Sequence, residues 1–313
     1  MERLEVDVTL GHASRERRMK EPAGDRQLNA LLIVVLAAFS LSVIYPLIYV
    51  LSASVSETSA VTSGEVWLLP VGFSVNAYKA VFESPLLFRS ILNSLFYAGM
   101  VIVVGTFATM AGGYALSRKD MPGRNVFTFL FMVTMLFSGG MIPTYLVVRD
   151  LGLLNTVWAM ILPGAVSVWQ LIITRTFFAQ TIPAELLESA KVDGANDFTF
   201  FFRIALPLSI PILAVNMLLY GVSTWNSWFG ALIYLTNEEL YPLQLAMRNI
   251  LVQNTFDPAK MAGVDPTRIA EMQELAGKLK FALIVIASIP PLIAYPFVQK
   301  HFVKGMMIGS VKG

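Results

Sequence analysis

The side chains that could contact a substrate in this chain are neutral amides and aromatic rings set within long apolar stretches. Those stretches contain no Asp, Glu, Lys or Arg in their interiors, so they offer no proton relay or ion-coupling carboxylate. Amides can donate to and accept from hydroxyl groups, and aromatic planes can pack on the apolar face of a pyranose ring. This chemistry suits a sugar. The substrate-pathway candidates are Asn93, Gln170, Asn216, Tyr220, Trp225, Asn226 and Trp228.

A structural interpretation of the same residues stays open. Asn and Gln commonly form hydrogen bonds between helices in membrane bundles, and for Asn93 and Gln170 that role is favoured. A continuous helix from Pro207 would place Trp225 about 27 Å further along, near the outer leaflet. Aromatic belts occur at that depth too. A role in an aromatic belt and a role in sugar contact are therefore equally compatible with the sequence of residues 225–228.

The composition argues against catalysis by this chain. It has no cysteine and only two histidines, His12 and His301, one near each end, which speaks against a His/Cys metal site. It also lacks a phosphate-binding Gly-x-x-x-x-Gly-Lys-Ser/Thr sequence and a nucleophile elbow. A net charge of +2 is too small for a nucleic-acid footprint. We expect a protein that is not an enzyme, with no metal, cofactor or nucleic acid bound.

A polar segment between two apolar stretches carries a second set of candidate residues. Pro183 suits the first turn of a helix, Gly194 suits its end, and Asn196 or Asp197 suits the N-cap of a following helix. An apolar stripe repeats at helical spacing within the first helix: Leu186, Leu187 and Ala190. We expect a helix, a glycine turn and a second helix, with a protein partner covering the stripe.

Six apolar stretches must position these residues. A helix crosses the hydrocarbon core with about 20 apolar residues, and the chain is 56% hydrophobic and only 14% charged. Alternating patterns typical of a β-barrel are absent. Prolines and glycines would bend several spans, namely Pro143, Pro163, Pro290, Pro291 and the pair Gly139-Gly140. The charge-free stretches run from Arg26 to Glu57, Arg89 to Arg118, Arg124 to Arg149, Asp150 to Arg175, Arg203 to Glu238 and Lys280 to Lys300.

The distribution of basic residues predicts the orientation. Most of the 23 Lys and Arg residues fall on one side of the six spans, and the positive-inside rule places that side, with both termini, in the cytoplasm. The first apolar run is too long for a cleavable signal peptide. We expect cytoplasmic tails at 1–27 and 301–313 around a membrane domain at 28–300. Its long loops are 176–206 inside, and 54–87 and 236–279 outside.

The inner loop also resembles a known motif. Glu188-Ser189-Ala190, Gly194 and Ile204-Ala205-Leu206-Pro207 resemble the EAA loop of binding-protein-dependent ABC importer permeases, with Ser189 where the family usually has Ala. Asn93-Ser94, the run from Gly113 to Arg118 and Trp225-Asn226 resemble the carbohydrate class of that family. The run from Phe137 to Tyr145 resembles a branch that handles oligosaccharides, including acidic alginate or aldouronate fragments.

This resemblance implies an all-α integral membrane protein with six transmembrane helices, a type I ABC importer permease bundle in a bacterial cytoplasmic membrane. It further implies a second homologous permease, two ATPase subunits that use ATP and Mg, an external solute-binding protein and an oligosaccharide substrate. The inner loop would dock on an ATPase subunit. A stand-alone facilitator or channel and a non-transporting scaffold are the alternatives. The implied coupling residues are Glu185, Glu188, Ser189, Ala190, Asp193, Gly194, Ala195, Ile204, Leu206 and Pro207.

Overall fold

The computed structural model describes residues 23–253, 277, 279–296 and 299, and within these ranges every regular element is a helix. The chain divides into two compact units, Met1–Ile48 and Tyr49–Gly313. The described part of the first unit belongs to α1 (Ala23–Ser54), whose side chains are largely exposed and apolar. The predicted C-terminal tail, most of the N-terminal tail and residues 254–276 of the outer loop lie outside the described residues.

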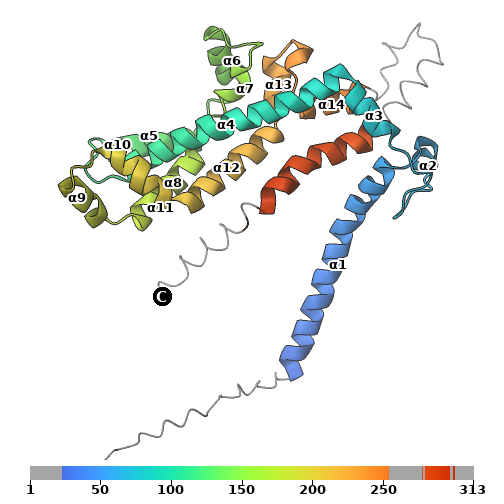
Figure 1. The fold of residues 1–313 in the computed structure, drawn as a ribbon, viewed down its shortest axis with the longest axis horizontal. Helices are drawn as coiled ribbons and strands as arrows, with labels where there is room; N and C mark the ends of the chain where they lie inside the picture. Colours follow the sequence, from blue (N-terminus) through green and yellow to red (C-terminus); the bar gives the residue numbers. More distant parts are fainter. Residues whose placement is uncertain (1–22, 254–276, 278, 297–298, 300–313) are drawn as a thin grey trace, which may run out of the picture. The chain divides into compact units, whose positions relative to one another are not determined.

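The longest described helix, α4 (Pro85–Ser117), is the axis of the second unit. It packs against α12 (Ile210–Trp225) and α8 (Val168–Thr181), as Figure 1 shows. Ser84 caps its first turn by accepting a hydrogen bond from Leu87 N, and Pro85 stands where a helix needs no donor. Small side chains on its buried face allow neighbouring backbones to approach closely: Ser90, Ser94, Ala98, Gly105, Thr109 and Gly113.

Three described helices are long and apolar enough to cross a membrane: Gln27–Ser54, Pro85–Ser117 and Leu279–Pro296. Two bent helix pairs would raise this number to five if each pair forms one span. The fourth predicted span is divided into a short α7 (Trp158–Ile161) and α8, with Pro163 and Gly164 between them. The all-helical membrane fold is confirmed, while the count of six spans stays a prediction.

The two bent pairs show where helix breakers act. The third predicted span consists of α5 (Arg124–Leu136) and α6 (Met141–Asp150), which meet at 116°. Gly140, with φ +84°, adopts a conformation there that L residues avoid. The fifth predicted span bends by 81° at Ser209. The assumption of one continuous helix from Pro207 to Trp225 was therefore wrong. Pro290 and Pro291, by contrast, lie within the unbroken Leu279–Pro296 helix.

The loops predicted on opposite membrane sides lie at opposite ends of α4 (Figure 1). At its C-terminal end are α9 (Ala184–Val192), α10 (Asp197–Phe200), a π-helical turn (Phe201–Ala205) and α11 (Leu206–Leu208). At its N-terminal end are α3 (Asn76–Glu83) and α14 (Leu243–Gln253). The remaining short elements are α2 (Thr58–Thr62), α13 (Phe229–Tyr234) and a 3-10 turn (Glu238–Leu240). Which end faces the cytoplasm stays a prediction.

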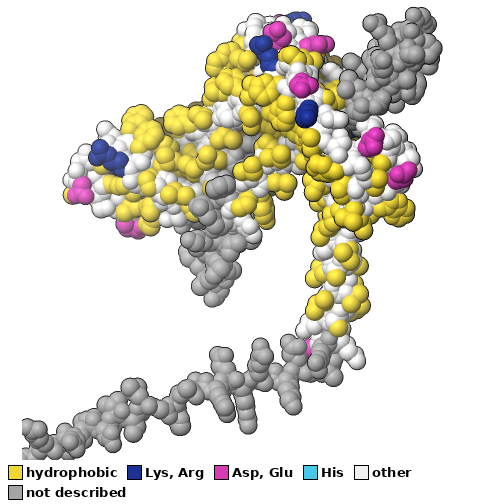
Figure 2. All heavy atoms as spheres, turned by 45° about the vertical axis from the view of Figure 1, so that its right-hand side comes forward, with side chains coloured by type: hydrophobic (Ala, Val, Ile, Leu, Met, Phe, Trp, Pro, Cys, Tyr) yellow, Lys and Arg dark blue, Asp and Glu magenta, His cyan; other side chains and the backbone are white. Residues whose placement is uncertain are grey.

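The surface of the second unit is largely apolar. On the face shown in Figure 2, hydrophobic side chains cover most of this unit and the charged ones gather at its extremities. Val103 and Phe107 on α4 are examples of large exposed apolar side chains in mid-helix. A soluble protein rarely exposes apolar patches of this size, so the surface suits a bilayer or other membrane subunits.

Candidate functional site

The predicted glycine turn joins α9 to α10. Gly194 has φ +79°, and its N–H donates to Lys191 O at 3.0 Å. The N–H of Ala195 donates to Ala190 O at 2.9 Å, which completes a Schellman motif. Asn196 then caps α10 by accepting from Thr199 N at 2.8 Å. The predicted helix, glycine turn and helix are confirmed, and the hydrogen bonds make the connection stiff.

The prediction that a protein partner covers the apolar stripe of α9 was wrong. Ala190 is buried and Leu186 and Leu187 are partly buried, in one cluster with Phe178 and Phe200 of the same chain. The segment that follows α9 folds back and brings its own aromatic residues beneath the stripe. Periodicity alone could show that the stripe would be covered, but it could not show by what.

Five of the ten predicted coupling residues are exposed at α9, three on its outer face and two in the turn that follows it: Glu185, Glu188, Ser189, Asp193 and Gly194. Beyond the turn, Ile204 and Leu206 are partly buried in the aromatic cluster, whereas Pro207 is exposed. Two apolar side chains here were missed in the sequence, Val192 (88% exposed) and Phe198 (78% exposed). These exposed side chains, hereafter the exposed rim, are therefore acidic and apolar, a composition that could bind a protein partner. The coupling role of all these residues stays a prediction.

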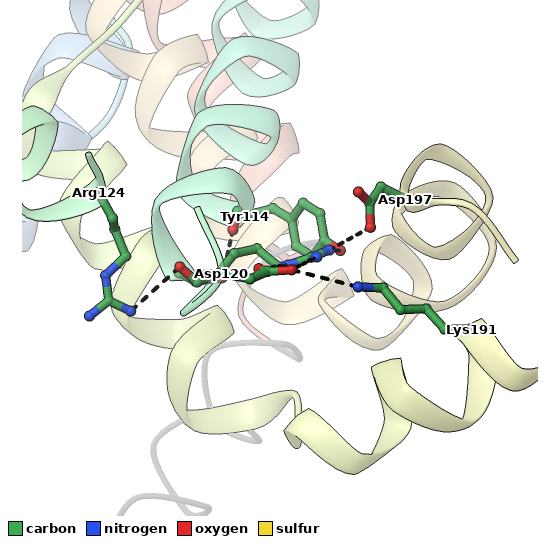
Figure 3. Close-up of polar contacts among 7 residues, drawn as sticks. Tyr114, Asp120, Arg124, Lys191 and Asp197 are labelled. Atoms are coloured by element: carbon green, nitrogen blue, oxygen red, sulfur yellow. Dashed lines mark hydrogen bonds and ion pairs between the residues drawn. The ribbon is translucent and has the colours of Figure 1, made fainter. Parts of the chain in front are cut away.

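A guanidinium group gathers charged residues from both sides of the glycine turn (Figure 3). Arg118, the C-cap of α4, donates to Asp120 through Nε at 2.7 Å and also through Nη2. Its Nη1 donates to Asp197 Oδ1 at 2.8 Å and to the Tyr114 hydroxyl at 2.9 Å. Lys191 Nζ lies 3.6 Å from Asp120 Oδ2. Thus α4, α9 and α10 meet in one charged cluster, hereafter the Arg118 cluster: Arg118, Asp120, Lys191 and Asp197.

The electrostatics keep the Arg118–Asp120 pair charged. Hydrogen bonds from Arg118 lower the pKa of Asp120 to about 2, and the same bonds raise the pKa of Arg118. The carboxylate of Asp120 therefore remains ionised throughout the physiological pH range. A cleft of about 680 Å³ opens beside the cluster, between the end of α4 and α9, and Asp120 and Lys191 both line it.

A second feature is a cavity of about 560 Å³ beside α12 and the α7–α8 break. Gln170 and Tyr220, two of the predicted substrate-pathway residues, line it. The Tyr220 hydroxyl accepts from Ser167 N at 2.9 Å and bonds to Thr109 Oγ1 at 2.6 Å. Tyr220 thereby connects the cavity wall to α4.

The other predicted pathway residues lie outside this lining. Asn216 is 1% exposed and donates to Thr174 Oγ1 at 2.8 Å. Asn93 donates to Glu239 O at 2.7 Å, at the N-terminal end of α4.

Three further candidates lie at the end of α12. Trp225 is buried and donates to Ala287 O at 2.8 Å. Trp228 packs under the Arg248 guanidinium, 4.7 Å from the ring centroid, and Asn226 is exposed. These contacts hold helices and loops together, and a substrate role for these residues stays a prediction.

Several cavity-lining residues were missed because hydroxyl side chains within apolar stretches were not counted. Ser223 and Thr224 follow Tyr220 on α12 at spacings of three and four residues, which places them on one helix face, and Ser227 follows just beyond the end of the helix. Such a polar stripe is visible in the sequence. Trp169, 62% exposed, adds an aromatic plane from α8. Thr144, Ser167 and Tyr234 add further polar groups, and none of the lining residues in the described part of the chain is charged.

No cluster of three or more His, Asp or Glu that could hold a metal occurs in the part of the chain that the structure describes. His12 and His301 lie outside that part. The expectation that this chain binds no metal or other cofactor stays a prediction.

Comparison with known proteins gives matches that cover most of the chain. A model of the family described as binding-protein-dependent transport system inner membrane component matches residues 118–308. The polygalacturonan/rhamnogalacturonan transport system permease protein YtcP of Bacillus subtilis (strain 168) is 42% identical over 289 residues, which are 92% of this chain and 99% of that protein. Protein LplC of the same organism is 40% identical over 298 residues, 94% and 98% of the two chains.

Among solved structures, the crystal structure of a bacterial ABC transporter involved in the import of the acidic polysaccharide alginate contains a similar chain. It superposes with a TM-score of 0.80 at 36% identity, covering 91% of this chain and 99% of that one. A chain of the bacterial alginate ABC transporter in complex with an alginate pentasaccharide-bound periplasmic protein has a TM-score of 0.51 at 17% identity, which supports the fold alone.

Proposed function

The chain belongs to the family of binding-protein-dependent transport system inner membrane components, and from this membership we propose that it is a permease subunit of an ATP-driven oligosaccharide importer. It would line the pathway together with a second, homologous permease in a bacterial cytoplasmic membrane, with both termini in the cytoplasm. Two separate ATPase subunits would use ATP and Mg, and an external solute-binding protein would deliver the sugar.

The structural observation that supports this proposal is the stiff helix–turn–helix at one end of α4. One face of α9 is fixed on the aromatic cluster, and the other is exposed with acidic and apolar side chains. A short element held by a Schellman turn can transmit a rigid-body displacement, whereas a loose loop would absorb it. The exposed rim is therefore the surface we assign to an ATPase subunit.

The cavity beside α12 is the part of the pathway that this chain would contribute. Its lining combines the Trp169 ring, the Gln170 amide and a stripe of hydroxyl groups, which together can bind sugar hydroxyls and pack on a ring face. The relatives named above handle polygalacturonan/rhamnogalacturonan and the acidic polysaccharide alginate. We therefore assign an acidic oligosaccharide as substrate. Because none of the lining residues that the structure describes is Lys or Arg, the cations that pair with the carboxylates of the oligosaccharide would come from the second permease.

The proposal predicts that transport needs the whole assembly. Lipid vesicles containing both permeases and both ATPase subunits are expected to accumulate an acidic oligosaccharide only when ATP and the binding protein are supplied. The measurement is uptake of a labelled oligogalacturonate, with a neutral cello-oligosaccharide of equal length as the comparison. Uptake by this chain alone would identify a facilitator. Absence of flux with all partners present would identify a scaffold.

Replacing Trp169 by alanine is expected to raise the sugar concentration for half-maximal uptake by about tenfold, which corresponds to a loss of about 1.4 kcal/mol of binding energy. The reason is the loss of an aromatic plane from the cavity wall. Trp158→Ala is the matched control, because Trp158 is also exposed but does not line the cavity. Equal effects of the two substitutions would contradict the assignment of this cavity to the pathway.

A further inference from the structure

The Arg118 cluster joins three elements that the glycine turn alone would not hold together. Arg118 is the C-cap that directly follows α4, Lys191 is on α9, and Asp197 is the first residue of α10. Asp120 bridges Arg118 and Lys191. The cluster therefore fastens both arms of the inner helix–turn–helix to the same point at the end of α4.

Arg118 is not an ordinary surface ion pair. Its side chain is 13% exposed, and four of its five N–H groups donate to Asp120, Asp197 and Tyr114. Two of these bonds form a fork on one carboxylate, the geometry that makes Arg pairs strong and directional. Exposed single ion pairs contribute little, but a partly buried fork with further partners fixes the positions of the groups that it joins.

Aromatic packing supports the cluster from below. The Tyr114 ring contacts the rings of Phe178 on α8, Phe200 on α10 and Phe201 in the π-helical turn, with centroid distances of 5.6, 6.2 and 5.1 Å. The Arg118 guanidinium lies 5.7 Å from the centroid of the same ring. Tyr114 thus limits the movement of Arg118 relative to α4 and to the segment after the turn.

Movement of α4 would reach the cavity directly. Thr109 of α4 bonds to the Tyr220 hydroxyl, which also accepts from Ser167 N at the cavity wall. Across the 680 Å³ cleft, the contact between Asp120 and Lys191 joins the two walls. A continuous series of packed and hydrogen-bonded groups therefore runs from α9 to the cavity.

We infer that Arg118 and Asp120 are positioning residues that transmit the displacement of the inner helix–turn–helix to α4, and through α4 to the sugar pathway. This inference rests on the proposed function. The inference places the coupling between the inner helix–turn–helix and α4 in an ionic connection at residues 118 and 120, outside the EAA-like segment. Without the connection, the inner loop could still bind an ATPase subunit, but its displacement would no longer move α4.

The test is the number of sugar molecules imported per ATP hydrolysed, measured in vesicles containing the complete complex. The double variant Asp120→Asn with Asp197→Asn removes both carboxylates from Arg118 while keeping the side-chain shapes. We expect the ratio to fall by at least about fivefold, the lower end of ordinary coupling effects, while the complex still assembles and hydrolyses ATP. As a single substitution, Asp197→Asn is also expected to lower the ratio of imported sugar to hydrolysed ATP. Asp197→Glu keeps a carboxylate at the start of α10 and is expected to keep most of the ratio that Asp197→Asn loses.

The matched control is Arg149→Gln. Arg149 pairs with Asp150 at 2.8 Å between adjacent residues at the end of α6, so its neutralisation should leave the ratio unchanged. A purely structural role would lower assembly, ATP hydrolysis and import together, with the ratio preserved, and would overturn the inference. If the unaltered complex imports no sugar with ATP and binding protein present, the proposed function itself fails. If it does import and the double variant keeps its ratio, only the inference fails.

Discussion

Gly194→Val is expected to abolish ATP-dependent uptake by the complete complex while leaving this chain inserted in the membrane. A β-branched residue at φ +79° is strained by about 1–2 kcal/mol. Relief of that strain requires the turn to change, which would break the hydrogen bonds of Ala195 to Ala190 and of Gly194 to Lys191. Both arms of the helix–turn–helix would then change direction. The measurement is uptake in vesicles, together with the amount of ATPase subunit that copurifies.

Two substitutions control for strain as such. Gly64 has φ +77° and, like Gly194, nothing within 4 Å of an added Cβ, so Gly64→Val imposes similar strain in a different loop and should leave uptake largely intact. Asn adopts the left-handed conformation more readily than Val, so Gly194→Asn should retain part of the uptake. Wild-type uptake by Gly194→Val, or equal losses at residues 64 and 194, would contradict the role of this turn.

Gly105→Ala is expected to destabilise the bundle by about 1–3 kcal/mol, the usual cost of overpacking. The added Cβ would lie 2.5 Å from the carbonyl oxygen of Ala165 and 3.2 Å from the Tyr220 ring. A backbone carbonyl cannot move away cheaply, so α4 and the α7–α8 segment would separate. Because the Tyr220 hydroxyl beside this contact bonds both to Thr109 of α4 and to Ser167 N at the cavity wall, we also expect slower sugar uptake. The measurements are the thermal midpoint in detergent and the uptake rate.

Gly99→Ala is the matched control in the same helix. An added Cβ there has nothing within 4 Å, and alanine is favoured over glycine in a helix by about 0.5–1 kcal/mol. The thermal midpoint should therefore stay the same or rise slightly. If Gly105→Ala proved as stable as Gly99→Ala, the close packing of α4 on the α7–α8 segment would be refuted.

The sequence was most informative where local rules determine the structure. Pro183, Gly194 and Asn196 predicted the bounds of α9 and the start of α10, because capping depends on a few neighbouring residues. Gly139-Gly140 and Pro163 predicted interruptions that the structure shows. Charge-free length predicted membrane helices, but it could not show that the chain bends at Ser209, since several apolar arrangements share one hydropathy profile.

Features that depend on distant parts of the chain were harder to predict. The stripe of α9 is covered by Phe178 and Phe200, whose arrival there is decided by the tertiary fold. The hydroxyl groups line a common cavity only because α12 lies beside the α7–α8 break in the folded chain. The Arg118 cluster joins residues 79 positions apart in the chain, a separation at which no spacing rule applies.

The interruption between α7 and α8 also limits which side of the bundle can face the lipid. Peptide groups outside a regular helix cannot remain in hydrocarbon without hydrogen-bonding partners, and residues 162–167 form no helix. Pro163 and Gly164 are exposed there, with nothing within 4 Å of an added Gly164 Cβ. That edge of the molecule must face water or another polypeptide. In the proposed assembly, the partner subunits and the sugar pathway would therefore lie on that side of the chain.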